Sequence, residues 1–222
     1  MIIPLPDLLN NTERTKIMSL VEGAAFEDGK KTAGWHARMV KNNEQMCDCP
    51  QLKEINQILM QALQRNELFN IATHPHVVRP FLISRCKDGG YYGTHVDNSL
   101  MFGERVSRTD ISMTVFLTAP ETYEGGELVT ENMARERRFK LPAGAAVCYP
   151  STTLHRVEPV TSGERIVACT WVQSRVRSAE QREILFDMDS ARRSLFNREG
   201  KSREFDLLTK AHANLLRRWA EL

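Results

Sequence analysis

The clearest chemical potential lies in the stretch YYGTHVDNSL, residues 91 to 100, which contains His95 and Asp97. In a regular β-strand, side chains alternate between the two faces, so these two would project to the same side. An imidazole and a carboxylate on one face can supply two ligands to a metal ion. Two polar residues on the solvated face of a strand would produce the same pattern, so the interpretation depends on a third ligand.

His155 is the candidate third ligand, in YPSTTLHRVEPV at the start of another predicted strand. Two histidines and one carboxylate on one side of Fe(II) leave the opposite coordination positions open for substrate and oxygen. Arg165 follows on the next predicted strand, across the turn VTSGE, so a hairpin would bring it close to His155. A guanidinium binds a carboxylate through two parallel hydrogen bonds. These residues predict a pocket for a small diacid that chelates the metal with one end.

Short β-prone runs separated by turns extend from about Val77 to Arg177, among them ISMTVFLTA, AAVCYP and RIVACTWVQSRV. The turn sequences DGG, YEGG, LPAG and VTSGE recur at short intervals, which is typical of an antiparallel sandwich, jelly roll or related barrel. A double-sheet fold of this kind can return His155 to His95 across a long sequence separation. No long helices alternate with these strands, which argues against a doubly wound parallel sheet.

Helical periodicity precedes the β region. The first predicted helix carries an apolar face that includes Ile17, with Asn11 or Thr12 as its N-cap and Asp28-Gly29 as its stop signal. A second helix follows Pro50 and presents leucine and isoleucine side chains along one stripe. Both helices are expected to cover the β region.

Helical periodicity also follows the β region. Ser178 and Gln181 have capping-box spacing, Gly200 interrupts the helix, and a final amphipathic helix reaches Trp219. We therefore divide the chain into an N-terminal helical and support region (1–76), a β core that carries the candidate metal ligands (77–177) and a C-terminal helical extension (178–222).

The composition excludes several broad classes of protein. The chain has 222 residues, of which 41% are hydrophobic and 26% charged, as in globular rather than disordered, collagen-like or coiled-coil proteins. Its 30 basic and 28 acidic residues are mixed along the sequence, so no nucleic-acid partner is expected. No apolar run approaches the ~18 residues of a membrane span and no signal-peptide pattern is present, so we expect a cytoplasmic protein without a membrane partner.

Other residues that could bind metal lack partners in the sequence. The pair Cys47 and Cys49 has no second close Cys or His pair, as a zinc site requires, and is interpreted as two free thiols before a helix. His74 and His76 lie between prolines with no nearby carboxylate and are interpreted as loop residues. The odd number of cysteines, without framework spacing, fits a reducing compartment.

Longer segments make the hypothesis specific: GTHVDNSL, RTDISMTVFLTAPETYEGGELV, FKLPAGAAVCYPSTTLHRVEPVTSGERIVACTWVQSRVR and AEQREILFDMD. They resemble the bacterial PKHD-type hydroxylases, which are relatives of the prolyl 4-hydroxylases within the Fe(II)/2-oxoglutarate-dependent dioxygenases. Looser similarity in TAGWHARMVKNNEQM extends the resemblance over nearly the whole chain.

The resemblance implies a double-stranded β-helix, or jelly roll, flanked by helices. His95, Asp97 and His155 match the family's iron ligands, and Arg165 matches the residue that binds the distal carboxylate of 2-oxoglutarate. The implied reaction is hydroxylation of a peptide, protein or small molecule, with release of succinate and carbon dioxide. Ascorbate as a reductant of the iron and a role in iron homeostasis are also implied; the prime substrate is not.

One position departs from the family pattern. Members commonly carry Arg-Tyr where this chain has Arg85-Cys86, and that tyrosine can help to hold the 2-oxoglutarate carboxylate. A thiol is shorter than a phenol and forms weaker hydrogen bonds. Tyr91 or Tyr92 would have to reach inward in its place.

Two further hypotheses stay open at this stage. Cys86 is compatible with a non-catalytic iron or 2-oxoglutarate sensor that engages a partner through its helical tail. A homodimer through the same extension is a hypothesis about assembly. Trp171, on the last predicted core strand, is interpreted as core packing rather than as a cosubstrate contact.

Overall fold

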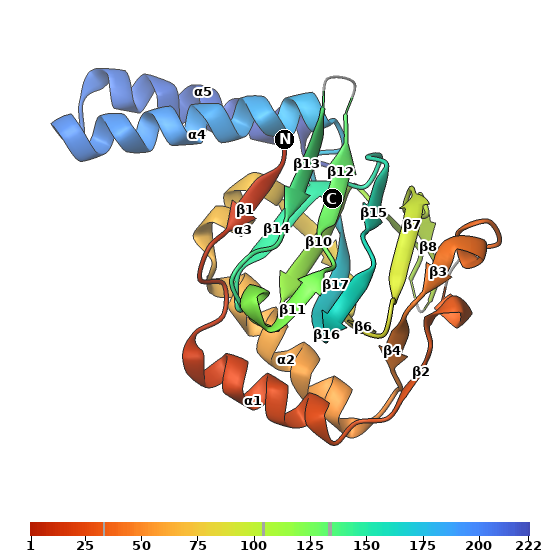
Figure 1. The fold of residues 1–222 in the computed structure, drawn as a ribbon. Coiled ribbons are helices and arrows are strands. Elements are labelled where there is room, and N and C mark those ends of the chain that lie inside the picture. Colours follow the sequence, from red (N-terminus) through yellow and green to blue (C-terminus); the bar gives the residue numbers. More distant parts are fainter. Residues whose placement is uncertain (33, 104, 133–134) are drawn as a thin grey trace.

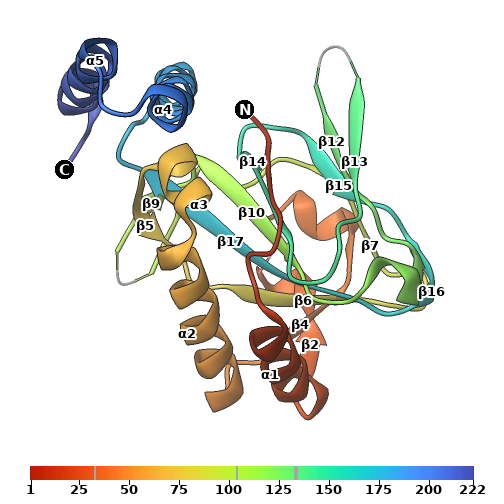
Figure 2. The same cartoon turned by 90° about the vertical axis from the view of Figure 1, so that its left-hand side faces the viewer.

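Two β-sheets lie face to face, and helices cover the outer side of the larger one (Figures 1 and 2). This computed structural model describes residues 1–32, 34–103, 105–132 and 135–222. A mainly β fold with a jelly-roll core, N-terminal helices and a C-terminal helical extension is what the sequence predicts, and the structure confirms it.

The larger sheet runs in the order β1-β14-β10-β17-β6-β4-β2, and β5 pairs separately with β17. Its strands are β1 (Ile3–Leu5), β14 (Ala146–Pro150), β10 (Ile111–Phe116), β17 (Arg165–Ser174), β6 (Leu82–Cys86), β4 (Glu44–Met46), β2 (Phe26–Asp28) and β5 (Pro75–Val78). The neighbours in this order pair antiparallel, as the recurring short turns predict.

The smaller sheet runs in the order β13-β12-β15-β7-β3. Its strands are β13 (Glu136–Phe139), β12 (Leu128–Glu131), β15 (His155–Val157), β7 (Tyr91–His95) and β3 (Lys41–Asn42). Two further pairs are β11 (Tyr123–Gly125) with β16 (Val160–Gly163) and β8 (Leu100–Met101) with β9 (Ser107–Arg108). The short 3-10 helices are η1 (Gly29–Thr32), η2 (Ala37–Val40) and η3 (Pro120–Thr122).

The two faces of the larger sheet have different side chains because residues alternate along each strand. On β10, Met113 and Val115 belong to the buried cluster that packs against the helices. Ser112 and Thr114, the alternating residues, line a cavity between the sheets. A smaller apolar cluster joins the two sheets beside that cavity and contains Phe116, Leu128, Phe139, Val147, Tyr149 and Val167.

The helices begin and end at residues with identifiable capping chemistry. They are α1 (Asn11–Glu22), α2 (Pro50–Arg65), α3 (Glu67–Thr73), α4 (Ala179–Glu199) and α5 (Arg203–Trp219). Among them, none is long and apolar enough to cross a bilayer within the described ranges. Ser178 caps α4 by accepting a hydrogen bond from the Gln181 amide, as predicted, and Gly200 follows the last residue of that helix.

The predicted ends of the first helix are wrong. Asn10, rather than Asn11 or Thr12, is the N-cap: its side chain accepts from the Glu13 amide at 2.9 Å, and Glu13 accepts from the Asn10 amide at 3.0 Å. The helix stops at Gly23 instead of continuing to Gly29, because the residues after Gly23 pair with β4 as a strand.

The N-terminal region contributes strands as well as helices. Residues 1–76 supply β1 and β2 to the larger sheet and β3 to the smaller one, so this region is part of both walls of the fold. Strand β5 crosses the predicted boundary between residues 76 and 77. The three-part division of the chain stays a prediction.

Helices α4 and α5 lie side by side and project from the sheets as an arm (Figures 1 and 2). At its base, Val176 forms an isolated β-bridge with Ala220, and the Glu221 amide donates to the Arg175 carbonyl at 2.7 Å. Inside α4, the carboxylate of Asp189 pairs with Arg193, which also reaches Glu67 on α3 at 2.6 Å. The arm is therefore attached to the core mainly at its base.

Candidate metal centre

Two histidines face each other across neighbouring strands of the smaller sheet. Strand β7 ends at His95 and β15 begins at His155, and the antiparallel register places these two residues directly opposite each other. Opposed residues project to the same face, so their imidazole rings approach with centroids 4.2 Å apart. The strand pairing alone brings together residues that are far apart in sequence.

Asp97 reaches the same place from a loop. Strand β7 ends before it, so Asp97 does not share a regular strand with His95. Instead, the hydroxyl of Ser112, on β10 of the opposite sheet, donates to the Asp97 carboxylate at 2.5 Å. Ser112 also lies 2.8 Å from the hydroxyl of Ser151. The carboxylate is thus held between the two sheets by a buried pair of hydroxyls.

The backbone sets the tautomer of both histidines. Nδ1 of His95 lies 2.8 Å from the carbonyl of Gly93, and Nδ1 of His155 lies 3.0 Å from the carbonyl of Thr153. A carbonyl only accepts, so each Nδ1 carries the proton and each Nε2 presents a lone pair. This is the arrangement in which a histidine can bind a metal through Nε2.

The donor set suits a divalent cation. One ligand atom from each of His95, Asp97 and His155 lies within 4.8 Å of the others. Burial, with a further contribution from His155, lowers the pKa of His95 to about 4, so this ring is neutral near pH 7. Two imidazoles and one carboxylate form an N,N,O set that leaves coordination positions free, as in non-haem iron oxygenases. The role of the three residues as iron ligands stays a prediction.

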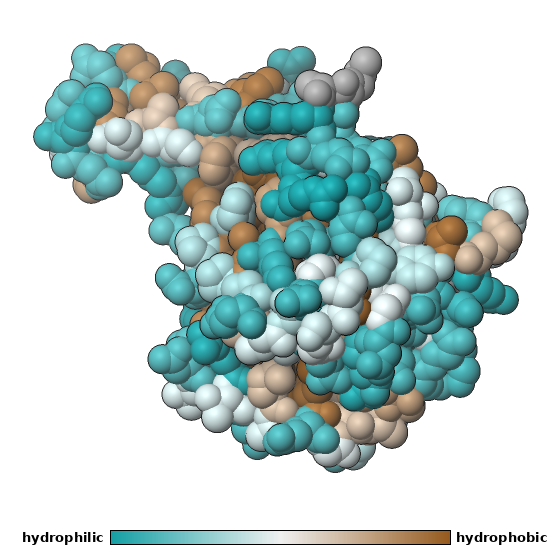
Figure 3. All heavy atoms as spheres, in the orientation of Figure 1, coloured by the Kyte–Doolittle hydropathy of each residue, from teal (hydrophilic) through white to brown (hydrophobic). Residues whose placement is uncertain are grey.

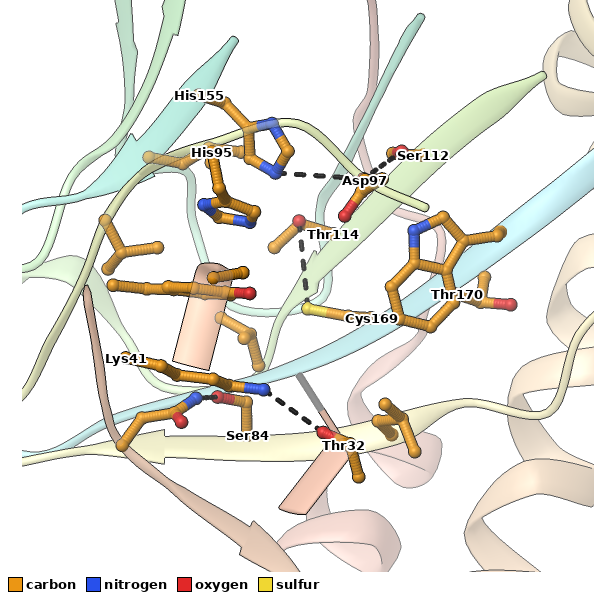
Figure 4. A pocket seen from close by; sticks show the side chains of 18 of the residues that line it. Thr32, Lys41, Ser84, His95, Asp97, Ser112, Thr114, His155, Cys169 and Thr170 are labelled. Atoms are coloured by element: carbon orange, nitrogen blue, oxygen red, sulfur yellow. Dashed lines mark hydrogen bonds and ion pairs between the residues drawn. The ribbon is translucent and has the colours of Figure 1, made fainter. Parts of the chain in front are cut away.

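The three side chains lie at one end of a cavity between the sheets (Figure 4). Arg165 also lines this cavity, although the predicted hairpin across VTSGE does not form: Val160–Gly163 is strand β16, and β15 and β17 belong to different sheets. It is the first residue of β17, is only 2% exposed, and lies opposite Cys86 of β6 in the strand register. Within the described part of the chain, its Nε has no hydrogen-bond partner. A buried guanidinium with an unmet donor is a suitable carboxylate site.

Glycine makes room for Arg165. Gly126 has φ of +69°, and a methyl group on it would lie 2.9 Å from Cδ of Arg165 and 3.1 Å from Cε2 of Tyr123. Any side chain at this position would meet the arginine stem, in a backbone conformation that only glycine adopts easily. The motif YEGG does not form the predicted hairpin turn: Tyr123–Gly125 is strand β11, which pairs with β16 and not with the following strand β12. Gly126 supports the wall behind Arg165.

The structure shows which tyrosines lie near the cavity, where Cys86 replaces the tyrosine of the family. Tyr91 is 36% exposed and does not line the cavity, whereas Tyr92 lines it and stacks on His95 with centroids 3.6 Å apart. Tyr123 packs near Arg165 behind the cavity, and its buried hydroxyl has no partner among the described residues. Burial raises the pKa of the Cys86 thiol, which keeps it neutral. The position expected for a phenol is therefore occupied by a neutral thiol, and Tyr92, together with Tyr149, lines the cavity.

The interpretation of Trp171 as core packing is wrong. Its side chain is half-buried and lines the cavity, because it alternates with Thr170 and Val172 on β17 and shares the inward face with Arg165. His74 is half-buried and His76 exposed, and they belong to no metal-ligating cluster within the residues described. Cys47 and Cys49 are free thiols before α2.

Sequence reasoning missed Ser112 and Lys41. Ser112 has a weak signal in the sequence: it alternates with Thr114 on a strand that is otherwise apolar, which marks a polar inward face. Lys41 lies on β3, outside the region predicted to form the core, and lines the cavity in the structure. A two-residue strand has no recognisable period, so nothing in the sequence indicates that this lysine faces inward.

Comparisons of the sequence with protein families give two matches. Residues 81–173 match the model of the 2OG-Fe(II) oxygenase superfamily, and residues 180–221 match that of the PKHD-type hydroxylase C-terminal domain. A PKHD-type hydroxylase of Synechococcus elongatus is 51% identical over 223 residues, which is 100% of both chains. One of Colwellia psychrerythraea is 51% identical over 221 residues, which is 99% of both chains.

Solved structures share the fold at low sequence identity. A Pseudomonas putida prolyl-4-hydroxylase has a TM-score of 0.51 and 18% identity, covering 78% of this chain and 92% of that chain. A Trichoplax adhaerens prolyl hydroxylase, in complex with a hypoxia inducible factor peptide fragment, has a TM-score of 0.55 and 11% identity, covering 78% and 83%. These likenesses concern the arrangement of the sheets and helices.

The hydrogen bond from Ser112 generates a prediction about metal binding. Ser112→Ala removes the donor that orients Asp97, so we expect the affinity for Mn(II) to fall by about tenfold or more. Calorimetric titration under anaerobic conditions measures this affinity. Ser84→Ala is the matched control: Ser84 also lines the cavity, but its hydroxyl accepts from Asn43 at 2.7 Å. Equal affinities in the two variants would contradict the orienting role.

Proposed function

Because this chain belongs to the PKHD-type hydroxylases of the 2OG-Fe(II) oxygenase superfamily, we propose that it binds Fe(II) through His95, Asp97 and His155 and 2-oxoglutarate through Arg165. The chain is an oxidoreductase of the hydroxylase type. One observation carries the residue assignment: three ligand atoms converge at one end of a cavity that Arg165 also lines.

Each residue contributes in a way that follows from its surroundings. Iron with 2-oxoglutarate supplies the oxidising chemistry, in which succinate and carbon dioxide leave and a substrate carbon is hydroxylated. His95 and His155 would bind the metal through Nε2, because Nδ1 of each ring lies against a backbone carbonyl, and Asp97 would supply a carboxylate oxygen. Arg165, buried at the start of β17, anchors the distal carboxylate. The buried walls of the cavity keep the reacting groups away from bulk water.

The prime substrate is an unidentified peptide, protein or small molecule. Exposed apolar residues next to lining residues offer it a surface: Trp35, 83% exposed, follows Gly34, and Phe102, 74% exposed, follows Met101. A substrate with an apolar portion would pack against these exposed side chains. The known substrates of structurally similar prolyl hydroxylases do not select one, because a shared fold does not specify a substrate.

An enzyme is favoured over the non-catalytic sensor. Cys86 was the feature that supported a sensor, but it lies opposite Arg165 and leaves the guanidinium facing the cavity. The relatives that cover the full chain are named as hydroxylases. No observation on the described residues specifically supports a sensor.

Two finer aspects of the proposal rest on the family resemblance: ascorbate as a reductant that maintains Fe(II), and a role in iron homeostasis. The proposed cytoplasmic location rests instead on the sequence, in which no apolar run approaches the length of a membrane span. We propose no nucleic-acid or membrane partner, consistent with the mixed charges of the chain. Growth of a deletion strain under iron limitation tests the link to iron, and wild-type growth would contradict it.

A homodimer through the C-terminal arm is the proposed assembly. Helix α5 is amphipathic, yet none of its residues is buried, and Ile184 and Phe196 of α4 and Leu207 of α5 are 45%, 47% and 49% exposed. Figure 3 shows apolar side chains gathered on this arm. A second copy could cover them. Light scattering at micromolar concentrations should give twice the mass of one chain, and a monomeric mass would exclude this assembly.

The metal assignment has a spectroscopic test. With Fe(II) and 2-oxoglutarate under anaerobic conditions, the wild type should develop a visible absorption band, and oxygen should then yield succinate. His95→Ala and Asp97→Ala each remove one ligand, so both signals should be lost. His76→Ala replaces an exposed histidine away from the cavity and should keep both. If either ligand variant retains the band at wild-type strength, that residue does not bind the iron.

Arg165 is tested through cosubstrate affinity. Arg165→Ala removes a buried charge-assisted pair, so the affinity for 2-oxoglutarate should fall by about 100-fold while metal binding is kept. Calorimetry on the Mn(II)-loaded protein measures both. Arg85→Ala is the control, because Arg85 lies on the neighbouring strand and pairs with Glu44 at 2.7 Å instead of lining the cavity. Similar affinities for the two variants would show that the diacid binds elsewhere.

A further inference from the structure

Lys41 is a buried cation in the wall of the same cavity. It lies on β3, at the edge of the smaller sheet, and is only 5% exposed. Lysine is rarely this buried unless its charge is paired. Its side chain lines the cavity together with the metal triad (Figure 4), and Arg165 lines the same cavity.

The ammonium group of Lys41 is held in place but incompletely satisfied. Its Nζ donates to Oγ1 of Thr32 at 3.1 Å, and Thr32 in turn donates to Gln45 at 2.7 Å. The same Nζ lies 5.0 Å from the centre of the Tyr92 ring. A lysine ammonium has three donors. Within the described ranges of the chain, no carboxylate lies within ion-pair distance of it.

Two observations place Lys41 beside the path between the metal triad and Arg165. The Tyr92 ring, over which its ammonium sits, stacks on His95, so Lys41 is one aromatic layer away from the triad. At the other end, Cys86 lies opposite Arg165 in the strand register, and both of these residues line the same cavity as Lys41. Lys41 therefore flanks the space that a diacid would occupy between His95 and Arg165.

We propose that Lys41 is a second carboxylate-binding residue of this cavity and contacts 2-oxoglutarate bound between the metal triad and Arg165. The inference rests on the proposed function. The charges are complementary: the ligand has two carboxylates, and the cavity walls present two cations on different sheets, with Asp97 as the carboxylate of the triad. A compact ammonium with free donors can meet a carboxylate oxygen without the planar geometry that arginine needs.

Burial explains why an anion is needed at this position. Desolvation lowers the pKa of Lys41, because burial disfavours the charged form of its side chain. A carboxylate beside the ammonium would offset that cost. Lys41 would then contribute to cosubstrate affinity, whereas a purely structural lysine would act on the packing of Tyr92 and Thr32 alone.

Calorimetric titration of 2-oxoglutarate into the Mn(II)-loaded full-length protein tests the proposal, because it reports affinity without turnover. Lys41→Met keeps the length of the side chain and removes the charge, so the Kd should rise at least tenfold. Lys41→Arg restores a cation and should bring the Kd back to within about threefold of wild type. Lys31→Met is the matched control, since Lys31 is 65% exposed, pairs with Glu27 and does not line the cavity. Its Kd should equal that of wild type.

Two additional readouts separate the outcomes. Mn(II) affinity and the thermal unfolding temperature of Lys41→Met should match wild type, which shows that the fold and the triad are intact. If wild type itself does not bind 2-oxoglutarate, the proposed function fails. If wild type binds it and Lys41→Met binds within twofold of wild type, the role of Lys41 is refuted. A Kd that rises equally in Lys41→Met and Lys41→Arg would also refute it, because a loss that charge does not rescue indicates packing.

Discussion

The register between β7 and β15 is the constraint on which the site depends. It places His95 opposite His155. Nδ1 of each ring lies against a backbone carbonyl, of Gly93 and Thr153 respectively, so Nε2 is the nitrogen that each ring can present to a metal. A shift of one residue in this pairing would send one histidine to the other face of the sheet. The rest of the smaller sheet, including the edge strand that carries Lys41, is organised around this pair.

The two faces of the larger sheet have different roles, because side chains alternate along its strands: one face packs in the core, and the other lines the cavity. On β10 and β17, most residues that face the helices are apolar and pack in the main core, while the alternating residues turn serine, threonine, arginine and tryptophan toward the cavity. This division allows polar groups to be buried near the ligands without interrupting the helix-facing core. It also explains how Asp97, on a loop of one sheet, is oriented by Ser112 of the other.

Two buried cations in the cavity wall have hydrogen-bond donors without acceptors among the described residues. Nε of Arg165 has no partner among the described residues, and Lys41 donates to a single threonine hydroxyl. Buried donors of this kind carry a desolvation cost that a bound anion can offset. Cys86, in the place of a family tyrosine, lies opposite Arg165 and lines the cavity together with Tyr92.

The sequence by itself determined the class of fold and the residues with chemical potential. Turn spacing and β-prone runs indicated an antiparallel sandwich, jelly roll or related barrel, and the family resemblance implied the jelly roll. The motifs around His95, Asp97, His155 and Arg165 suggested an iron site with a diacid. These features are local, so they can be recognised in short windows. Helix ends were less predictable, because capping at Asn10 and the pairing of β2 depend on competing neighbours.

Tertiary structure alone decided which other residues reach the cavity. Ser112, Lys41 and Tyr92 come from three strands in two sheets, and their convergence depends on strand pairings between distant segments. Trp171 was assigned to the core from its type, although the alternation of β17 turns it inward beside Arg165. The physical reason is that residue type sets what a side chain can do, whereas register and sheet packing set which surroundings it meets.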